Sequence, residues 1–136
     1  MEFELDPRLA ADSHWVADGP LCQLRLMDDS RFPWLVLVPR VAGAVEWFDL
    51  GQSDQHSMLE EVGRAARLLR ELSGCDKINL GALGNIVRQL HVHVVARSPA
   101  DAAWPGPVWG SGEAKRFSAG ALESRLAQLR MQWAGR

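Results

Sequence analysis

The side chains with the clearest chemical potential lie in one short segment, where Gln89, His91 and His93 alternate with apolar residues. Successive side chains of a β-strand point to opposite faces, so a strand here would place these three polar groups in a row. The apolar residues between them would then pack on the core. A polar row on such a segment is unfavourable unless the face is solvated, internally hydrogen-bonded or used. Two imidazoles in a row can act on one ligand, one attacking while the other donates to an oxygen.

The spacing of His91 and His93 is compatible with three interpretations. The histidines can lie on an exposed sheet face without a particular role. They can supply two ligands to zinc or another transition metal, because a His-x-His pair on a strand points both rings the same way. One of them can also act as a nucleophile, because a neutral imidazole needs no prior activation. The spacing alone does not choose among the three.

A glycine-containing turn precedes the two histidines and favours a phosphate ligand. Gly81 and Gly84-Asn85 follow Asn79, which lies in a short apolar segment. Backbone amides that are exposed in such a turn suit phosphate oxygens. The turn therefore favours nucleophilic chemistry at a phosphate over the other two interpretations.

The stretch from Asp76 to Arg97 resembles the signature of the histidine-triad (HIT) family. In that signature three histidines alternate with apolar residues after an Asn-containing strand and a Gly-rich turn. The resemblance extends to the segments 34–39 and 53–74 and to their order, and it covers roughly residues 20–98. The tail over 101–110 looks like that of small bacterial members of the family.

The resemblance implies a nucleotide hydrolase or nucleotidyl transferase with His91 as the catalytic nucleophile. In the family, this middle histidine attacks the α-phosphorus of a nucleotide, and water then releases a nucleoside monophosphate from the covalent nucleotidyl-histidine. His93 matches the third histidine, which contacts the phosphate, and Gln89 matches the first, which supports the others. The implied substrate is a purine nucleotide conjugate, such as a nucleoside phosphoramidate or a dinucleoside polyphosphate.

Further binding residues follow from the same resemblance. Asn79, Gly84 and Asn85 match the phosphate-binding strand and turn, with Asn85 where the family usually has Gln. Asp28 lies near the acid or amide that binds the ribose hydroxyls, with Asp29 as the alternative. The chemistry needs no metal or other cofactor, and Mg²⁺ would serve only to shield the charge of a polyphosphate substrate.

The chain departs from the family pattern at three positions near the nucleophile. Gln89 replaces the first histidine, Trp34 replaces a histidine before the second strand, and Ile86 stands where many members have Ser or Thr. A Gln amide both donates and accepts, so the supporting geometry can survive while the proton handling changes. Two alternatives therefore stay open. One is a nucleotide-binding protein without turnover, and the other is a metal-binding protein that uses His91 and His93.

The hydrophobic pattern predicts an α+β fold. It marks strands over 21–28, 34–39, 76–81 and 86–97, and amphipathic helices over 53–73 and 118–133. Residues 6–17 are typical of a short helical or irregular packing segment. The order of strands, helix, strands and helix is that of helices packed on an antiparallel sheet. The HIT resemblance further implies a five-stranded antiparallel sheet with two main helices, and a homodimer.

We expect one domain over residues 1–136, with a core at about 20–98 and a C-terminal tail and helix at 99–136. The tail contains Trp104 and Trp109. These two rings can flank the ligand pocket and stack on a base. They can equally pack the irregular tail onto the sheet or across a dimer.

Composition excludes several classes of protein. Of 136 residues, 47% are hydrophobic and 24% charged, the balance of an ordinary soluble protein. The formal net charge of -2 argues against nonspecific binding to nucleic acid, which needs a dense basic surface. No apolar run approaches the roughly 20 residues that span a membrane. The N-terminus lacks the basic-then-apolar order of a signal peptide, so we expect a cytoplasmic protein.

Overall fold

The computed structural model describes residues 1–135 of the chain. Its central element is a five-stranded antiparallel sheet. The spatial order of its strands is β1-β2-β3-β5-β4, and every neighbouring pair is antiparallel. The strands are β1 (Ser13–Asp18), β2 (Cys22–Met27), β3 (Trp34–Pro39), β4 (Lys77–Gly81) and β5 (Val92–Arg97). The predicted five-stranded antiparallel sheet is therefore confirmed.

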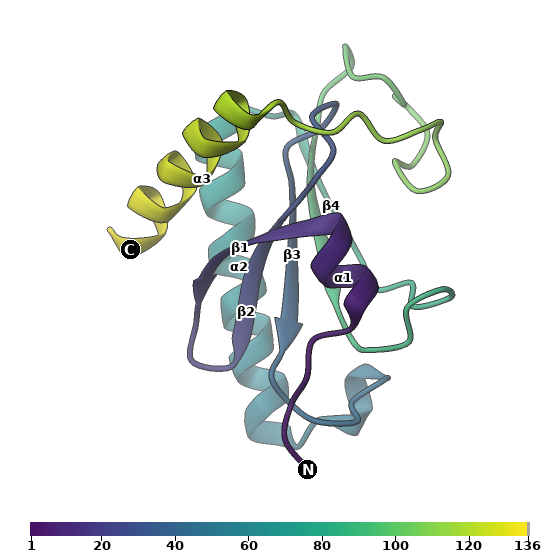
Figure 1. Cartoon of the computed structure of the whole chain (residues 1–136), viewed down its shortest axis with the longest axis vertical. Coiled ribbons are helices and arrows are strands. Elements are labelled where there is room, and N and C mark those ends of the chain that lie inside the picture. The colour runs from purple at the N-terminus through teal and green to yellow at the C-terminus, as the bar shows by residue number, and fades with distance from the viewer. Residues whose placement is uncertain (136) are drawn as a thin grey trace.

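Helices cover both faces of this sheet (Figure 1). They are α1 (Pro7–Asp12), α2 (Gln52–Ser73) and α3 (Ala119–Ala134), with a short 3-10 helix η1 (Trp47–Asp49). Helices α2 and α3 pack on one face and α1 packs on the other. The two long helices confirm the two predicted main helices. Helix α2 ends at Gly74, whose φ of 65° is a left-handed conformation that glycine adopts without a steric penalty.

Alternation along β3 and β5 divides the interior into two cores. Leu35 and Leu37 of β3 join the core beneath α2, together with Val94 of β5. Trp34 faces the opposite core, which lies beneath α1. His93 of β5 lies on this α1 side, because its ring accepts a hydrogen bond from the Trp34 indole. The period-two pattern therefore correctly separated His93 from its apolar neighbours.

The prediction of a strand over 86–97 is wrong in its first half. Strand β5 begins only at Val92, and residues 86–91 have no regular structure. The backbone N–H of Leu90 donates to the carbonyl of Ala44, outside the strands of the sheet. The side chain of Gln89 bonds to the N-terminal segment. Gln89 and His91 therefore precede the strand, and the three polar residues do not form one row on it.

Residues 6–17 contain a strand that the sequence pattern did not mark. Only Pro7–Asp12 is helical, and β1 then forms the edge of the sheet by pairing with β2. The register shifts between Trp15 and Ala17, so the burial of β1 does not alternate regularly. This bulge hides the period of two by which a half-buried strand is recognised.

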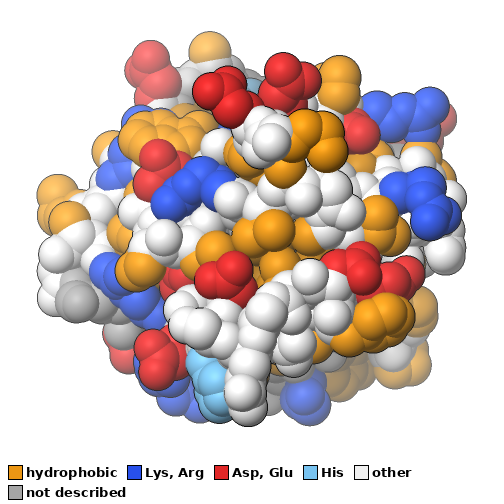
Figure 2. All heavy atoms as spheres, turned by 90° about the horizontal axis from the view of Figure 1, so that it is seen from below, with side chains coloured by type: hydrophobic (Ala, Val, Ile, Leu, Met, Phe, Trp, Pro, Cys, Tyr) orange, Lys and Arg blue, Asp and Glu red, His pale blue; other side chains and the backbone are white. Residues whose placement is uncertain are grey.

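The surface mixes charges of both signs. On the face seen in Figure 2, acidic, basic and apolar side chains are interspersed and no continuous basic patch is seen. This distribution agrees with the small net charge of -2. Within residues 1–135, no helix has the length and hydropathy to cross a membrane.

Candidate active site

His91 and His93 line a cavity of about 630 Å³ on the α1 side of the sheet. Its walls come from segments that are far apart in the sequence. They are α1, the loop over 83–87 and the tail over 108–114, together with Asp29 and Arg31 from the β2–β3 connection. A cavity of this size falls in the range of small-molecule sites.

A nearby backbone carbonyl, that of Gln89, sets the tautomer of the His91 ring. Its Nδ1 lies 2.7 Å from the carbonyl oxygen of Gln89. A carbonyl can only accept, so Nδ1 carries the proton and Nε2 keeps its lone pair. Because no hydrogen bond engages Nε2 within residues 1–135, this atom is available as a nucleophile.

The His93 ring has the opposite polarity. Its Nδ1 accepts a hydrogen bond of 3.0 Å from the indole N–H of Trp34, so its proton resides on Nε2. Burial, with repulsion from His91, lowers the pKa of His93 from 6.5 to about 3. As the pH falls below 6.5, His93 gains a second ring proton in the unfolded chain but stays neutral in the folded protein. The contribution of neutral His93 to the free energy of unfolding is therefore complete above pH 6.5 and declines below it.

The two imidazoles thus form a complementary pair. Their ring centroids are 4.9 Å apart, and both residues are only 6% exposed. In these tautomers His91 offers a lone pair and His93 offers an N–H donor. A phosphate group placed between them could be attacked at phosphorus by one ring while an oxygen accepts from the other.

We predict that Trp34→Phe raises the pKa of His93 above its wild-type value of about 3. The indole N–H stabilises the neutral ring, in which Nδ1 is an acceptor. Its loss leaves a buried acceptor without a partner, which costs roughly 1–3 kcal/mol of stability. Ring ¹⁵N chemical shifts recorded during an NMR titration report both the tautomer and the pKa.

Trp109→Phe is the matched control for this substitution. Trp109 also packs edge-on against His93, with a centroid distance of 5.5 Å, but its indole nitrogen is buried without a hydrogen-bond partner within residues 1–135. Both variants remove the same ring volume, and only one removes a donor to His93. An equal shift of the His93 pKa in the two variants would contradict the role of the Trp34 N–H.

The glycine turn reaches the cavity, and its predicted phosphate-binding role stays a prediction. Gly84 and Asn85 line it beside His91 and His93, and Gly84 has a positive φ of 69°. The same two residues line a second cavity of about 330 Å³, which His91 also borders. The predicted residues Gly84, Asn85, His91 and His93 are therefore brought together in one place.

Asn79 and Asp28 have different surroundings and do not line this cavity. The side-chain oxygen of Asn79 accepts from buried Arg97 at 2.9 Å. Asp28 accepts from the backbone N–H of Phe117 and from Arg116, each at 2.9 Å, and so anchors the C-terminal segment. Of the two adjacent aspartates, it is Asp29 that lines the cavity.

Gln89 contacts His91 through its backbone, and its side chain does not line the cavity. Its carbonyl orients His91, while its amide group bonds to the backbone of residues 4–6. Three further residues line the cavity without having been assigned to it from the sequence. Arg8 and Arg31 lie in no recognised motif, and Trp109 was compatible with either a pocket role or a packing role. Trp109 packs on His93 and also lines the cavity, and its stacking on a base stays a prediction.

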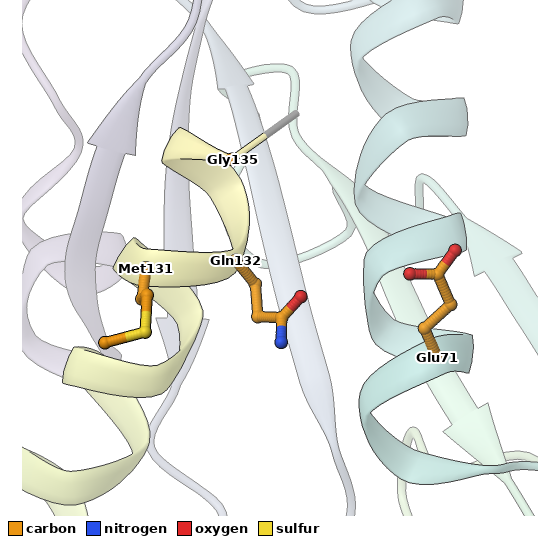
Figure 3. A pocket seen from close by; sticks show the side chains of 4 residues that line it. All are labelled: Glu71, Met131, Gln132 and Gly135. Atoms are coloured by element: carbon orange, nitrogen blue, oxygen red, sulfur yellow. The ribbon is translucent and has the colours of Figure 1, made fainter.

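Other parts of the molecule offer less chemistry. A hollow between α2 and α3 is lined by Glu71, Met131, Gln132 and Gly135, and this lining includes no imidazole, thiol or hydroxyl group (Figure 3). Across the described residues, no group of three or more His, Cys, Asp or Glu side chains is arranged to hold a metal ion. The cavity at His91 and His93 is therefore the site with the most reactive groups.

Comparison with known proteins identifies similar chains. The family model "HIT domain" matches residues 8–100. The crystal structure of a histidine triad protein from Bradyrhizobium japonicum is 41% identical, with 97% of this chain and 98% of that chain covered and a TM-score of 0.94. A comparison with curated proteins found no match.

Two other crystal structures are similarly close. A histidine triad protein from Sinorhizobium meliloti is 46% identical over 96% of each chain, with a TM-score of 0.93. One from Marinobacter aquaeolei is 40% identical, with 99% of this chain and 98% of that chain covered and a TM-score of 0.96. The similarity therefore extends over nearly the whole of each chain, including the C-terminal tail and helix.

Proposed function

The chain belongs to the histidine-triad (HIT) family, and from this premise we propose that it cleaves nucleotide conjugates at the α-phosphate. Members of the family bind nucleotides and include hydrolases and transferases. The proposed substrates are nucleoside phosphoramidates, dinucleoside polyphosphates or similar conjugates. The proposed intermediate is a nucleotide bound covalently to Nε2 of His91.

The observation that carries this proposal is the pair of ring contacts: His91 Nδ1 lies against the Gln89 carbonyl, and His93 Nδ1 accepts from the Trp34 indole. In the first step the lone pair of His91 Nε2 attacks the α-phosphorus, an N–P bond forms, and the bond to the leaving group breaks. The leaving group departs with the electron pair. The Nε2–H of His93 donates to a non-bridging oxygen whose charge increases in the transition state. The Gln89 carbonyl accepts from His91 Nδ1–H and stabilises the ring as it becomes cationic.

The second step restores the enzyme. Water attacks the same phosphorus and forms an O–P bond, the N–P bond breaks, and its pair of electrons returns to His91 Nε2. The proton that the water loses passes to solvent. The product is a nucleoside monophosphate, and an acceptor other than water would give transfer in place of hydrolysis. No step requires a metal, and we propose that Mg²⁺ contributes only by screening a polyphosphate substrate.

The cavity walls suit the other parts of a nucleotide. Leu9 and Val108 supply buried apolar surface, and Ile86 supplies exposed apolar surface, for a purine base. We propose that Asp29, rather than Asp28, binds the ribose hydroxyls, because Asp29 lines the cavity and Asp28 does not. Asp29 would do so while paired with Arg31. The proposed homodimer would bury apolar side chains beside edge strand β4, where Leu80 is 56% exposed.

The test is release of AMP from adenosine phosphoramidate and from diadenosine polyphosphates, with and without a chelator. We expect AMP to be released in both conditions. Rapid acid quench followed by mass spectrometry should detect one nucleotidyl group on the peptide that contains His91. Nucleotide binding without AMP release would favour a binding protein. Loss of activity with the chelator, together with stoichiometric metal in the protein, would favour a metal site at His91 and His93.

A further inference from the structure

The side chain of Gln89 fastens the N-terminal segment to the active site. Its Oε1 accepts from the backbone N–H of Asp6 and its Nε2 donates to the carbonyl of Glu4, both at 2.8 Å. These bonds join positions that are 83 and 85 residues apart in the sequence. The amide therefore uses a donor and an acceptor on the backbone of one short segment. The backbone carbonyl of the same residue holds the nucleophile His91.

The fastened segment leads directly into α1. The Asp6 carboxylate caps this helix by accepting from the N–H of Arg8 at 2.8 Å, and Pro7 occupies its first turn. Leu9, only 4% exposed, packs into the core that contains Trp34. Gln89, through the segment that leads into α1, and Leu9, through the core, thus both help to hold α1 against the cavity.

This position of α1 places the Arg8 guanidinium at the cavity wall. Arg8 lines the cavity, and its guanidinium makes no hydrogen bond or ion pair within residues 1–135. The other cation of the wall, Arg31, is already occupied, because it pairs with Asp29 at 2.8 Å and donates to the Ser111 carbonyl. Arg8 is therefore the guanidinium of the wall that can receive an anionic group without breaking an existing bond.

Building on the proposed function, we propose that Arg8 binds the anionic leaving-group side of the substrate and that Gln89 is the residue that positions it. The preferred substrate class would then be nucleotides that carry a further phosphate or other anion beyond the α-phosphate. A guanidinium can bind two phosphate oxygens at once, which a neutral wall cannot do. Gln89, which replaces the first histidine of the family pattern, would then contribute to substrate selection through its side chain.

The experiment compares equilibrium binding of AMP and ADP to the full chain by titration calorimetry. We expect wild type to bind ADP more tightly than AMP. Arg8→Ala should weaken ADP binding by roughly tenfold while AMP binding changes by less than about twofold. Arg8→Lys should recover part of the lost ADP affinity, because the charge remains and the planar fork is lost.

Gln89→Met tests the positioning role. It removes both bonds to the N-terminal segment and keeps the backbone carbonyl that holds His91, so it should cause the same selective loss of ADP affinity. In the double variant with Arg8→Ala the losses should not add, because both act through Arg8. Gln89→Glu, which removes the donor to Glu4 and keeps the length, is the second variant if Gln89→Met folds poorly.

Arg88→Ala is the matched control. Arg88 is an exposed arginine that borders the smaller cavity beside His91 and does not line the larger one. This variant should leave the preference for ADP unchanged. Equal weakening of AMP and ADP by Arg8→Ala, no effect of Arg8→Ala, or additive losses in the double variant would overturn the proposal.

The binding experiment also separates this inference from the proposed function. Wild type that prefers ADP through Arg8 but releases no AMP from any conjugate would retain the role of Arg8 and refute turnover. Wild type that releases AMP but shows no Arg8-dependent preference would retain turnover and refute the role of Arg8. Wild type that binds neither nucleotide would overturn the inference.

Discussion

His91→Ala is expected to lower the rate of AMP release by a factor on the order of 10⁴ or more, because it removes the nucleophile itself. His93 cannot replace it. Its Nδ1 is occupied by the Trp34 indole and its Nε2 carries a proton, so it has no lone pair to offer. The measurement is the initial rate of AMP release, together with mass spectrometry of acid-quenched protein, in which the nucleotidyl adduct should be absent.

A rescue experiment distinguishes loss of the nucleophile from damage to the fold. His91→Gly leaves space for imidazole, so added imidazole should restore AMP release in proportion to its concentration. His56→Ala serves as the control, because His56 is an exposed residue of α2 and lies outside the cavity. A His91→Ala variant that keeps more than about a tenth of the activity would assign the chemistry to another group.

Local periodicity was sufficient to place part of the site. His93 lies on the α1 face of β5 and Val94 on the α2 face, as alternation requires. Gly84 and Asn85 line the cavity together with His91, and only residues 86–90 separate this turn from that histidine. These predictions succeeded because each depends on a few consecutive residues.

Other features depend on contacts between distant residues and were not predictable from the pattern. The start of β5 is displaced to Val92, while the backbone N–H of Leu90 donates to the Ala44 carbonyl and the Gln89 side chain bonds to residues 4–6. The same bonds bring Arg8 to the cavity wall, although no local motif marks it.

The two aspartates after β2 illustrate a different limit. Asp28 and Asp29 are adjacent carboxylates at the end of a strand, and strand periodicity only says that they point in different directions. Asp28 is drawn to the C-terminal segment by Arg116 and Phe117, and Asp29 pairs with Arg31. The partners of both come from turns and tails whose course the sequence pattern does not determine.

Arg97 holds together the part of the structure that carries the tail to the cavity. Its side chain is only 2% exposed. It donates to Asp101 at 2.7 Å, to Asn79 at 2.9 Å and to the carbonyl of Gly106 at 2.8 Å. One side chain thus links β4, β5 and the loop that leads to the Trp109 wall of the site. Asn79, expected at the phosphate, instead serves this linkage.

We therefore predict that Arg97→Met lowers the free energy of unfolding by about 3–5 kcal/mol, because Asp101, whose side chain is only 8% exposed, loses its counter-charge. Urea titration followed by tryptophan fluorescence and by circular dichroism measures the change. Arg97→Lys should recover only part of it, since one ammonium cannot satisfy acceptors on three segments. Arg67→Met, at an exposed position of α2, should change the stability by less than about 0.5 kcal/mol.

The dependence of this loss on pH separates charge from packing. Arg97, with help from the backbone N–H groups of Ser98, Ala103 and Trp104, lowers the pKa of Asp101 from 3.8 to about 2. A carboxylate with a depressed pKa stabilises the fold fully above 3.8, and this contribution disappears as the pH falls through about 2. The stability difference between wild type and Arg97→Met should therefore shrink between about pH 5 and about pH 2. A difference that stays constant across that range would instead assign the effect to lost packing of the Arg97 side chain, whose guanidinium carbon lies 5.7 Å from the centre of the Phe32 ring.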